Sequence, residues 1–335
     1  GEQLPDLLAE AEEQAEQLNP WQRANLREIR QLYLHANATP TDLVEKIVMA
    51  RSESTMAWRE ARPKNDFKSL APKLDALFSL QREVATIKSE AMGVSPYEAL
   101  LDEYDPGRRE PQVDAIFADL EAFLPDFVQQ ALEKQSAGPD ILMPRGPFPV
   151  THQAQLSKEV MQILDFPFDH GRLDTAAHPF SGGAEGDLRI TTRYEEDDFT
   201  KSLMAVIHET GHALYENGRP HDWRGQPVGD SRGMTLHESQ SLLLEMQAAR
   251  SEEFIRFIGP VAQKILKGEG PAWDIDNLLR VYRKVEPGLI RVYADEVTYP
   301  LHVIMRYKLE KAIIADDIPI AELPIAWNDM MEQYL

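Results

Sequence analysis

The chain has 335 residues, of which 43% are hydrophobic, enough to bury a sizeable core. Its 56 acidic and 35 basic residues give a formal net charge of −21, which disfavours nucleic acid and anionic membranes as partners. Because cysteine is absent, disulfides and thiol catalysis are excluded, and no apolar run approaches the roughly 18 residues that indicate a transmembrane helix.

Residues 1–136 predict a series of amphipathic helices separated by proline-containing breaks. These breaks are expected at Asn19-Pro20, Pro40, Pro63, Pro96, Asp105-Pro106-Gly107 and Pro111. The first segment is rich in Glu, Ala and Leu and is typical of a solvated surface helix, because it is too short for a sustained coiled-coil repeat. Residues 137–150 hold four prolines and form a connection, after which 152–165 return to helix.

The pattern changes over residues 174–196, where Ser181-Gly-Gly183 precedes a β-prone alternation at 187–194. We expect a short strand or hairpin there, followed by a loop at 219–233. Further helices are predicted from about 235 to the end, broken near Pro260, 268–271 and 287–288. The sequence therefore predicts one mainly α domain over 1–335, with a small β element and metal-site helices in 197–335.

Residues 208–212 read His-Glu-Thr-Gly-His, an H-E-x-x-H pattern. On a helix, positions i and i+4 lie on one face, so His208 and His212 can bind one Zn²⁺ while Glu209 acts as general base. The flanks support a helix, with capping candidates at 197, 198 and 200 and a stop at Gly218 and Pro220. The alternative is a pair of solvated or capping histidines.

A catalytic zinc site needs a third protein ligand and one open position. Without cysteine, a carboxylate is the natural choice, and the candidates are Glu216, Glu238 and Glu245. We favour Glu238, because a ligand from a second, facing helix closes a tetrahedron more easily than Glu216 on the same helix. The alternative is that Glu238 forms a capping box with Thr235.

The H-E-x-x-H sequence is accompanied by several further motifs: His237-Glu238-Ser239-Gln240, His178-Pro-Phe180, Asp187-x-Arg189-x-Thr191, Ile290-Arg291-x-x-Ala294-Asp295, and the stretch from Trp58 to Phe67. Together these motifs resemble those of the M32 metallocarboxypeptidases, the thermostable carboxypeptidase Taq family. The resemblance implies that His208, His212 and Glu238 bind the metal and that Glu209 is the base. It also implies a helical fold with the site in a deep groove, and a homodimer.

One family motif, GxxQDxHW, has no match in this sequence, which begins at Gly1 and stops at Leu335 within an apparently helical stretch. We therefore expect a fragment that lacks the N-terminal helices and the C-terminal motif of the family. This expectation leaves open whether the chain is active by itself.

Arg291 is the candidate clamp for the terminal carboxylate of a substrate, because a guanidinium can donate two parallel hydrogen bonds to it. The alternative is a helical Arg291–Asp295 pair at i, i+4. Tyr293 and Tyr299 are possible donors to a developing oxyanion, although tyrosines in apolar helices usually belong to the core.

Four further residues have two interpretations each. Asp187 and Arg189 could orient metal ligands or simply pair at the strand edge. His178 could line the groove or be a structural histidine. His237 could donate to the oxyanion or merely follow the helix cap.

The sequence thus predicts a zinc-dependent carboxypeptidase that acts on peptides with a free C-terminus. We expect one Zn²⁺ per chain, with Co²⁺ as the alternative metal, no nucleic-acid or membrane partner, and a cytoplasmic homodimer. One alternative is a metallo-endopeptidase or dipeptidase that uses the same four residues. Another is a catalytically silent, metal-stabilised helical fragment.

Overall fold

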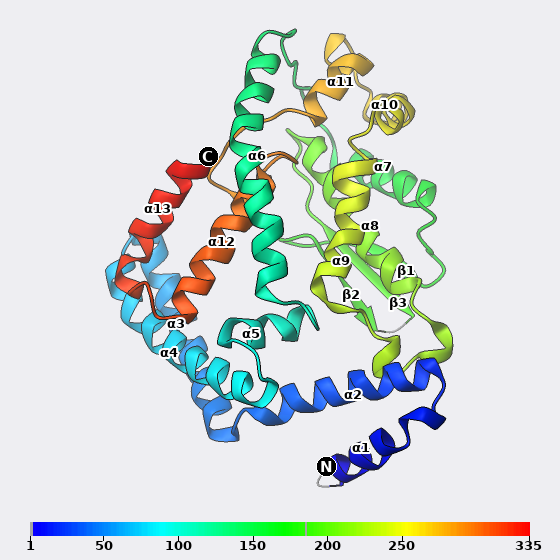
Figure 1. The fold of residues 1–335 in the computed structure, drawn as a ribbon. Helices are drawn as coiled ribbons and strands as arrows, with labels where there is room; N and C mark the ends of the chain where they lie inside the picture. The colour runs from blue at the N-terminus through cyan, green and yellow to red at the C-terminus, as the bar shows by residue number, and fades with distance from the viewer. Residues whose placement is uncertain (1–2, 185) are drawn as a thin grey trace.

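A computed structural model describes residues 3–184 and 186–335, and they form a mostly helical structure with one small sheet (Figure 1). The first six helices occupy the region predicted to be helical: α1 (Leu4–Glu13), α2 (Pro20–Ala38), α3 (Thr41–Ala61), α4 (Phe67–Met92), α5 (Pro96–Tyr104) and α6 (Glu110–Ser136). The remaining helices are α7 (Val150–Ile163), α8 (Phe199–Asn217), α9 (Gly233–Leu242), α10 (Glu252–Leu266), α11 (Ile275–Tyr282), α12 (Tyr299–Ile314) and α13 (Leu323–Tyr334).

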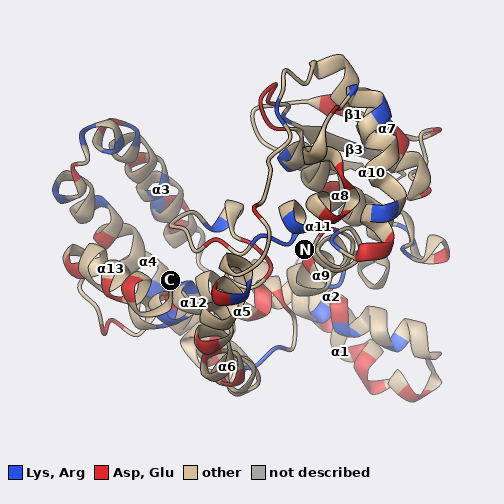
Figure 2. Cartoon of the chain, turned by 90° about the horizontal axis from the view of Figure 1, so that it is seen from above, with Lys and Arg blue, Asp and Glu red and all other residues tan. Residues whose placement is uncertain are grey.

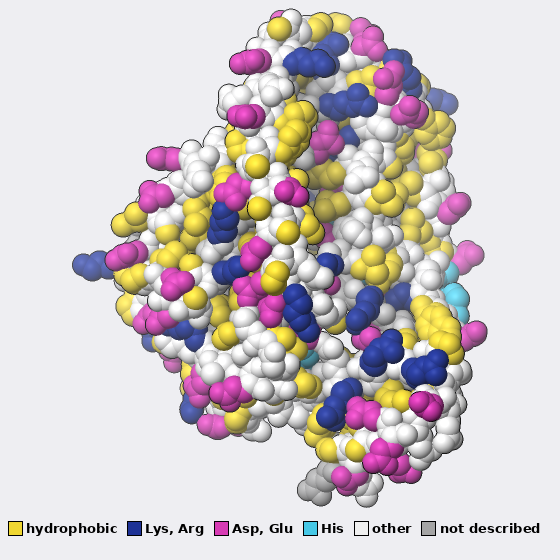
Figure 3. Space-filling view, in the orientation of Figure 1, with side chains coloured by type: hydrophobic (Ala, Val, Ile, Leu, Met, Phe, Trp, Pro, Cys, Tyr) yellow, Lys and Arg dark blue, Asp and Glu magenta, His cyan; other side chains and the backbone are white. Residues whose placement is uncertain are grey.

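The helices form two halves, which are seen side by side from above in Figure 2. One half holds α3, α4, α12 and α13, and the other holds α7 to α10 and the sheet (Figure 1). Helix α2 runs beneath both halves, and α6 stands in front between them. The space-filling view shows this face hollowed between α6 and the half that carries α8 and α9 (Figure 3).

Local capping explains where several helices begin. Asn19 accepts a hydrogen bond from the Gln22 N–H, and the Gln22 side chain accepts one from the Asn19 N–H, so α2 starts with a capping box. A similar capping arrangement from Ser95 starts α5. The proline breaks predicted from the sequence at 20, 40, 96 and 111 all fall at helix starts, because proline fits the first turn of a helix but not its interior.

The sheet has three strands in the order β1-β3-β2, with β1 at Gly171–Thr175, β2 at Phe180–Ala184 and β3 at Asp187–Thr192. Strands β2 and β3 form the predicted hairpin, whereas β1 pairs with β3 in parallel. Leu188, Ile190 and Thr192 point to the buried side of β3, as the alternation predicted. The sheet packs against α8 through a cluster of buried apolar side chains: Met161, Phe166, Leu188, Ile190, Val206 and Ala213.

The largest core cluster surrounds the other side of α8 and joins it to α7, α10 and α11. Its centre contains Phe199, which stacks on Trp273 with ring centroids 5.2 Å apart. Helix α8 is therefore packed between the sheet and this cluster, which fixes its position firmly.

The predicted break at Pro260 is wrong, because Pro260 lies inside α10. A proline in a helix loses one backbone hydrogen bond, but α10 buries Ile255, Ile258 and Leu266 against the core. That burial outweighs the lost bond. Among the described residues, no helix combines the length and the apolar character that a membrane span requires.

Candidate metal centre

Helix α8 carries the two histidines of the H-E-x-x-H sequence on the side that faces α9. It begins where Asp198 accepts a hydrogen bond from the Thr200 N–H, and it ends at Gly218, as the sequence predicted. His208 and His212 lie one turn apart, with ring centroids separated by 4.9 Å. Both side chains are mostly buried, which limits their freedom to turn away from a shared ligand.

Helix α9 carries the third candidate ligand. Glu238 Oε2 lies 3.3 Å from His212 Nε2, and Glu238 Oε1 lies 3.9 Å from His208 Nε2. One ligand atom from each of the three residues lies within 4.8 Å of the others, so the site matches the geometry of a metal centre. No capping box with Thr235 forms, because α9 begins at Gly233 and the Thr235 hydroxyl instead donates to Asp105.

The glycine inside the H-E-x-x-H sequence allows α8 and α9 to approach closely. A Cβ atom added at Gly211 would lie 2.6 Å from the Cα of Ser241 and 2.8 Å from the carbonyl oxygen of Gln240. Any side chain at this position would push α9 away from α8. The distance between the histidines and Glu238 therefore depends on Gly211.

Each histidine also contacts a partner through its second ring nitrogen. His208 Nδ1 lies 2.9 Å from Glu245 Oε2, on a π-helical segment (Leu243–Ala248) that continues α9. His212 Nδ1 lies 2.6 Å from His237 Nδ1, and His237 Nε2 lies 2.8 Å from Glu216 Oε1. Glu216 and Glu245, which the sequence suggested only as metal ligands, thus contact histidines in this structure.

The three candidate ligand residues bring several hydrogen-bond acceptor atoms close together. A carboxylate can only accept hydrogen bonds, so Glu245 accepts one from the His208 Nδ1–H, and Nε2 of the neutral ring carries no proton. Glu238 contributes two more acceptor oxygens near both Nε2 atoms. Because such atoms repel one another unless a cation lies between them, the residues present fit a divalent metal ion.

The carboxylates and imidazoles of the site shift each other's pKa values. The neighbouring His212 imidazole is the largest influence on Glu238 and holds the pKa of its carboxyl below its usual range, despite burial. Burial lowers the pKa of His208, but Glu245 and the neighbouring carboxylates outweigh this effect, so the pKa is raised overall. The site is thus a cluster of carboxylates around two imidazoles.

Glu209 differs from the other acidic residues of the site. It belongs to α8, only 7% of the residue is exposed, and burial raises the pKa of its carboxyl. No hydrogen bond within the described part of the chain engages this carboxyl. A buried, unengaged carboxylate with a raised pKa is suited to exchange protons with a water molecule.

Arg291 lies close enough to the ligands to affect them, since its charge helps to lower the pKa of Glu238. It belongs to a 3₁₀ turn (Arg291–Tyr293), and its Nη1 donates to the Tyr299 hydroxyl at 3.0 Å. Asp295 does not form the helical pair with Arg291: its carboxylate accepts hydrogen bonds from the backbone N–H groups of Val297 and Thr298, directly before α12.

The other candidates are spread around the sheet. Arg189 donates two hydrogen bonds to Asp187 at 2.7 and 2.8 Å, and both side chains are about half exposed. The carbonyl group of His178 accepts from the Thr191 hydroxyl, which ties the segment before β2 to β3. Tyr293 is 64% exposed and lies beneath the Lys201 ammonium group. The structure does not bring these side chains into contact with the three ligand residues.

A small cavity of about 210 Å³ adjoins the metal centre. It is bounded by the glycines of β2 on one side and by Glu216 and His237 on the other. The histidine that contacts His212 is therefore accessible from the sheet side of the site.

The sequence matches, over residues 1–335, the family described as Carboxypeptidase Taq (M32) metallopeptidase. The chain belongs to this family. It is 37% identical over 319 residues to thermostable carboxypeptidase 1 of Thermus thermophilus, and 36% identical over 295 residues to carboxypeptidase 1 of Bacillus subtilis. The solved structure of Trypanosoma cruzi metallocarboxypeptidase 1 superposes with a TM-score of 0.97 at 41% identity and covers 100% of this chain.

The chain is shorter than these relatives. The match covers 93% of this chain but 62% of the Thermus protein, and 87% of this chain but 58% of the Bacillus protein. It covers 67% of the Trypanosoma cruzi structure. The mainly helical fold with a small sheet is thus the fold of the corresponding two thirds of an M32 metallopeptidase.

Proposed function

We propose that this chain carries the catalytic centre of a metal-dependent carboxypeptidase, which removes residues from the C-terminus of peptides. One observation carries the proposal: His208, His212 and Glu238 converge within 4.8 Å beside the buried carboxyl of Glu209. Membership of the M32 family and relatives named as carboxypeptidases support the same reaction class.

His208, His212 and Glu238 would hold the metal, for which two imidazoles and one carboxylate are a donor set typical of catalytic zinc. When bound, the ion supplies a Lewis acid and a water molecule of lowered pKa. We therefore propose Zn²⁺, one per chain, with Co²⁺ as the alternative for the same donor set. Metal analysis of the purified protein tests the identity of the ion.

Glu209 would accept a proton from the attacking water and deliver it to the nitrogen of the leaving amino acid. Burial raises the pKa of this carboxyl, which favours the gain of a proton in the first step. The Tyr299 hydroxyl lies in the same region, hydrogen-bonded to Arg291, and can donate to the negative oxygen that develops on the substrate.

Arg291 would bind the free carboxylate of the substrate. Its guanidinium uses one donor on Tyr299, and within the described residues it is paired with no carboxylate. The remaining N–H groups can therefore form two parallel hydrogen bonds to a terminal carboxylate. Such a contact fixes the distance from the chain end to the scissile bond, which distinguishes a carboxypeptidase from an endopeptidase.

The test compares kcat/KM for a free-acid peptide and for the same peptide with an amidated C-terminus. We expect a high ratio in the wild type, and in Arg291→Lys a loss on the free acid of roughly 2–4 kcal/mol of transition-state stabilisation. Glu209→Gln serves as the control, since it should retain the metal while losing about 100-fold or more in turnover on both peptides. A wild-type ratio near one would favour the endopeptidase.

We also propose that the protein is a cytoplasmic homodimer, as expected from the family resemblance and the sequence. Light scattering coupled to size-exclusion chromatography tests the oligomeric state. A monomeric mass at micromolar concentration would contradict that part of the proposal.

A further inference from the structure

His237, next to the ligand Glu238, occupies an unusual position between three aromatic or charged groups. Its ring lies 4.6 Å from the His212 ring and 5.0 Å from the Tyr215 ring, measured between centroids. Its two nitrogens are both engaged, Nδ1 with His212 Nδ1 at 2.6 Å and Nε2 with Glu216 Oε1 at 2.8 Å. Its side chain is mostly buried, with 18% exposed. These contacts fix the orientation of the ring.

The order of donors and acceptors along this chain of contacts follows from Glu216. As a carboxylate, Glu216 only accepts, so the proton between the two residues belongs to His237 Nε2. The neutral His237 ring then has an unprotonated Nδ1, which can accept a hydrogen bond. The short contact to His212 therefore requires the proton on His212 Nδ1, which leaves His212 Nε2 free on the side of Glu238.

We infer that Glu216 and His237 are positioning residues that fix the metal-binding tautomer of His212. The inference rests on the metal centre proposed above and adds two residues to it. His237 is therefore not available to donate to the oxyanion, which was one interpretation of the sequence, since both of its ring nitrogens contact other residues of the chain.

The two histidine ligands are supported in different ways. His208 is oriented directly by Glu245, whereas His212 is oriented through an intervening imidazole. A hydrogen-bonded carboxylate behind a histidine ligand makes the ligand more basic and holds its ring in place. Glu216 contacts His237 and His237 contacts His212, and this relay transmits the effect of the Glu216 carboxylate to His212.

The test measures the affinity of the metal-free protein for Zn²⁺ by competition with a chromophoric chelator. His237→Phe keeps an aromatic ring but removes both hydrogen bonds, and Glu216→Ala removes the outer end of the relay. We expect each variant to bind Zn²⁺ about 10- to 100-fold more weakly than the wild type. Tyr215→Phe is the matched control, because it removes a hydroxyl that contacts Arg232 but leaves the relay intact, and its affinity should stay unchanged.

A spectroscopic measurement separates positioning from simple packing. In the zinc-loaded wild type, the His212 Nδ1 proton should give a low-field NMR resonance because of its short hydrogen bond. This resonance should move upfield or disappear in His237→Phe. Unfolding temperatures of the metal-free variants should stay close to that of the wild type.

Three outcomes would overturn the inference: unchanged Zn²⁺ affinity in His237→Phe and Glu216→Ala, an equal loss in Tyr215→Phe, or an unshifted His212 resonance. An equal loss in the control would assign the effect to packing between α8 and α9. If the wild type itself bound no Zn²⁺, the metal centre would fail and with it the proposed function. Failure of the relay alone leaves a wild type that binds Zn²⁺ normally.

Discussion

Helices α2 and α8 are both 19 residues long, yet they are held in place in opposite ways. Helix α8 buries ten residues between the sheet and the largest core cluster, whereas α2 buries none. Helix α2 is attached through polar contacts instead, including hydrogen bonds from Gln31 and His35 to Asp102 and an ion pair between Glu28 and Arg232. The two histidines of the candidate metal centre lie on the buried helix α8, whereas α2 has no buried residues.

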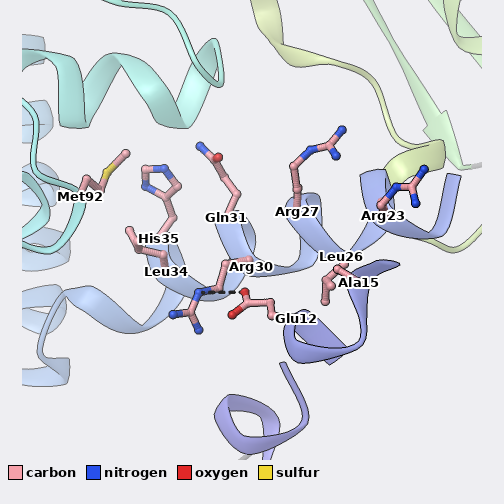
Figure 4. Close-up of a pocket in the computed structure, with 10 residues that line it drawn as sticks. All are labelled: Glu12, Ala15, Arg23, Leu26, Arg27, Arg30, Gln31, Leu34, His35 and Met92. Carbon is pink, nitrogen blue, oxygen red and sulfur yellow. Dashed lines mark ion pairs between the residues drawn. The ribbon is translucent and has the colours of Figure 1, made fainter. Parts of the chain in front are cut away.

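Figure 4 shows how this polar attachment is arranged. Arg23, Arg27, Gln31 and His35 recur every four residues and project from one face of α2, while Arg30 pairs with Glu12 on another. A helix held by such contacts can shift by exchanging hydrogen bonds with water, whereas a shift of α8 would open a cavity in the core. We therefore expect α8 to be the more stable of the two.

The largest expected effect comes from the same truncation in both helices. Leu203 in α8 is 2% exposed and Leu32 in α2 is 54% exposed. Leu203→Ala should lower the free energy of unfolding by about 2–5 kcal/mol because it removes buried apolar volume. Leu32→Ala should change it by less than about 0.5 kcal/mol. Equal losses in urea denaturation would contradict the comparison.

Gly211→Ala tests the close contact between α8 and α9. The added methyl group cannot fit against Ser241 without displacing backbone, so we expect a destabilisation of about 1–3 kcal/mol. Zn²⁺ affinity should fall as well, because Glu238 moves away with α9. Gly218→Ala, outside this contact, serves as the control, and it should retain full affinity. Normal metal binding in Gly211→Ala would show that the ligand distances do not depend on this contact.

Asp102→Asn tests the polar attachment of α2. Burial raises the pKa of Asp102, but hydrogen bonds from the Gly107 N–H, His35 and Arg109 outweigh it and hold the pKa below its usual range. A depressed pKa contributes stability above the unfolded-state pKa, near about 3.9, and this contribution is lost as the pH falls through the folded-state value. We expect a cost of about 1–2 kcal/mol at neutral pH that shrinks below about pH 4. A constant cost across this range would contradict the assignment.

The smallest effect concerns the capping box of α2. Asn19→Ala removes a side-chain acceptor for the Gln22 N–H and should cost about 1 kcal/mol. Because α2 has no buried residues, the loss should appear mainly as faster hydrogen exchange in its first turn. Unchanged exchange there would mean that tertiary contacts, and not the cap, hold the start of α2.

The sequence predicted the parts of this molecule that depend on neighbouring residues. The start of α8 at one of the three capping candidates, its end at Gly218 and the β2–β3 hairpin all follow from local capping and alternation. The two histidines of the site lie four residues apart, so their common face was also predictable. Glu238 required a choice among three carboxylates, which spacing and the family resemblance made.

The remaining features depend on contacts between distant segments. The pairing of His237 with Glu216 depends on how closely α8 approaches α9. Gly211 allows this approach, but its presence in the sequence does not predict it. The contact between Glu245 and His208 lies on a π-helical segment that no local pattern indicated. Pro260 was misinterpreted for the same reason, since its helix survives through tertiary burial.

The central claim is that α8 and α9 hold one divalent ion between His208, His212 and Glu238. Metal analysis after equilibrium dialysis of the wild type, His212→Ala and Glu238→Gln tests it most directly. We predict one Zn²⁺ per chain in the wild type, removable by a chelator, and far less than one in either variant. Full metal content in Glu238→Gln or His212→Ala would contradict the claim.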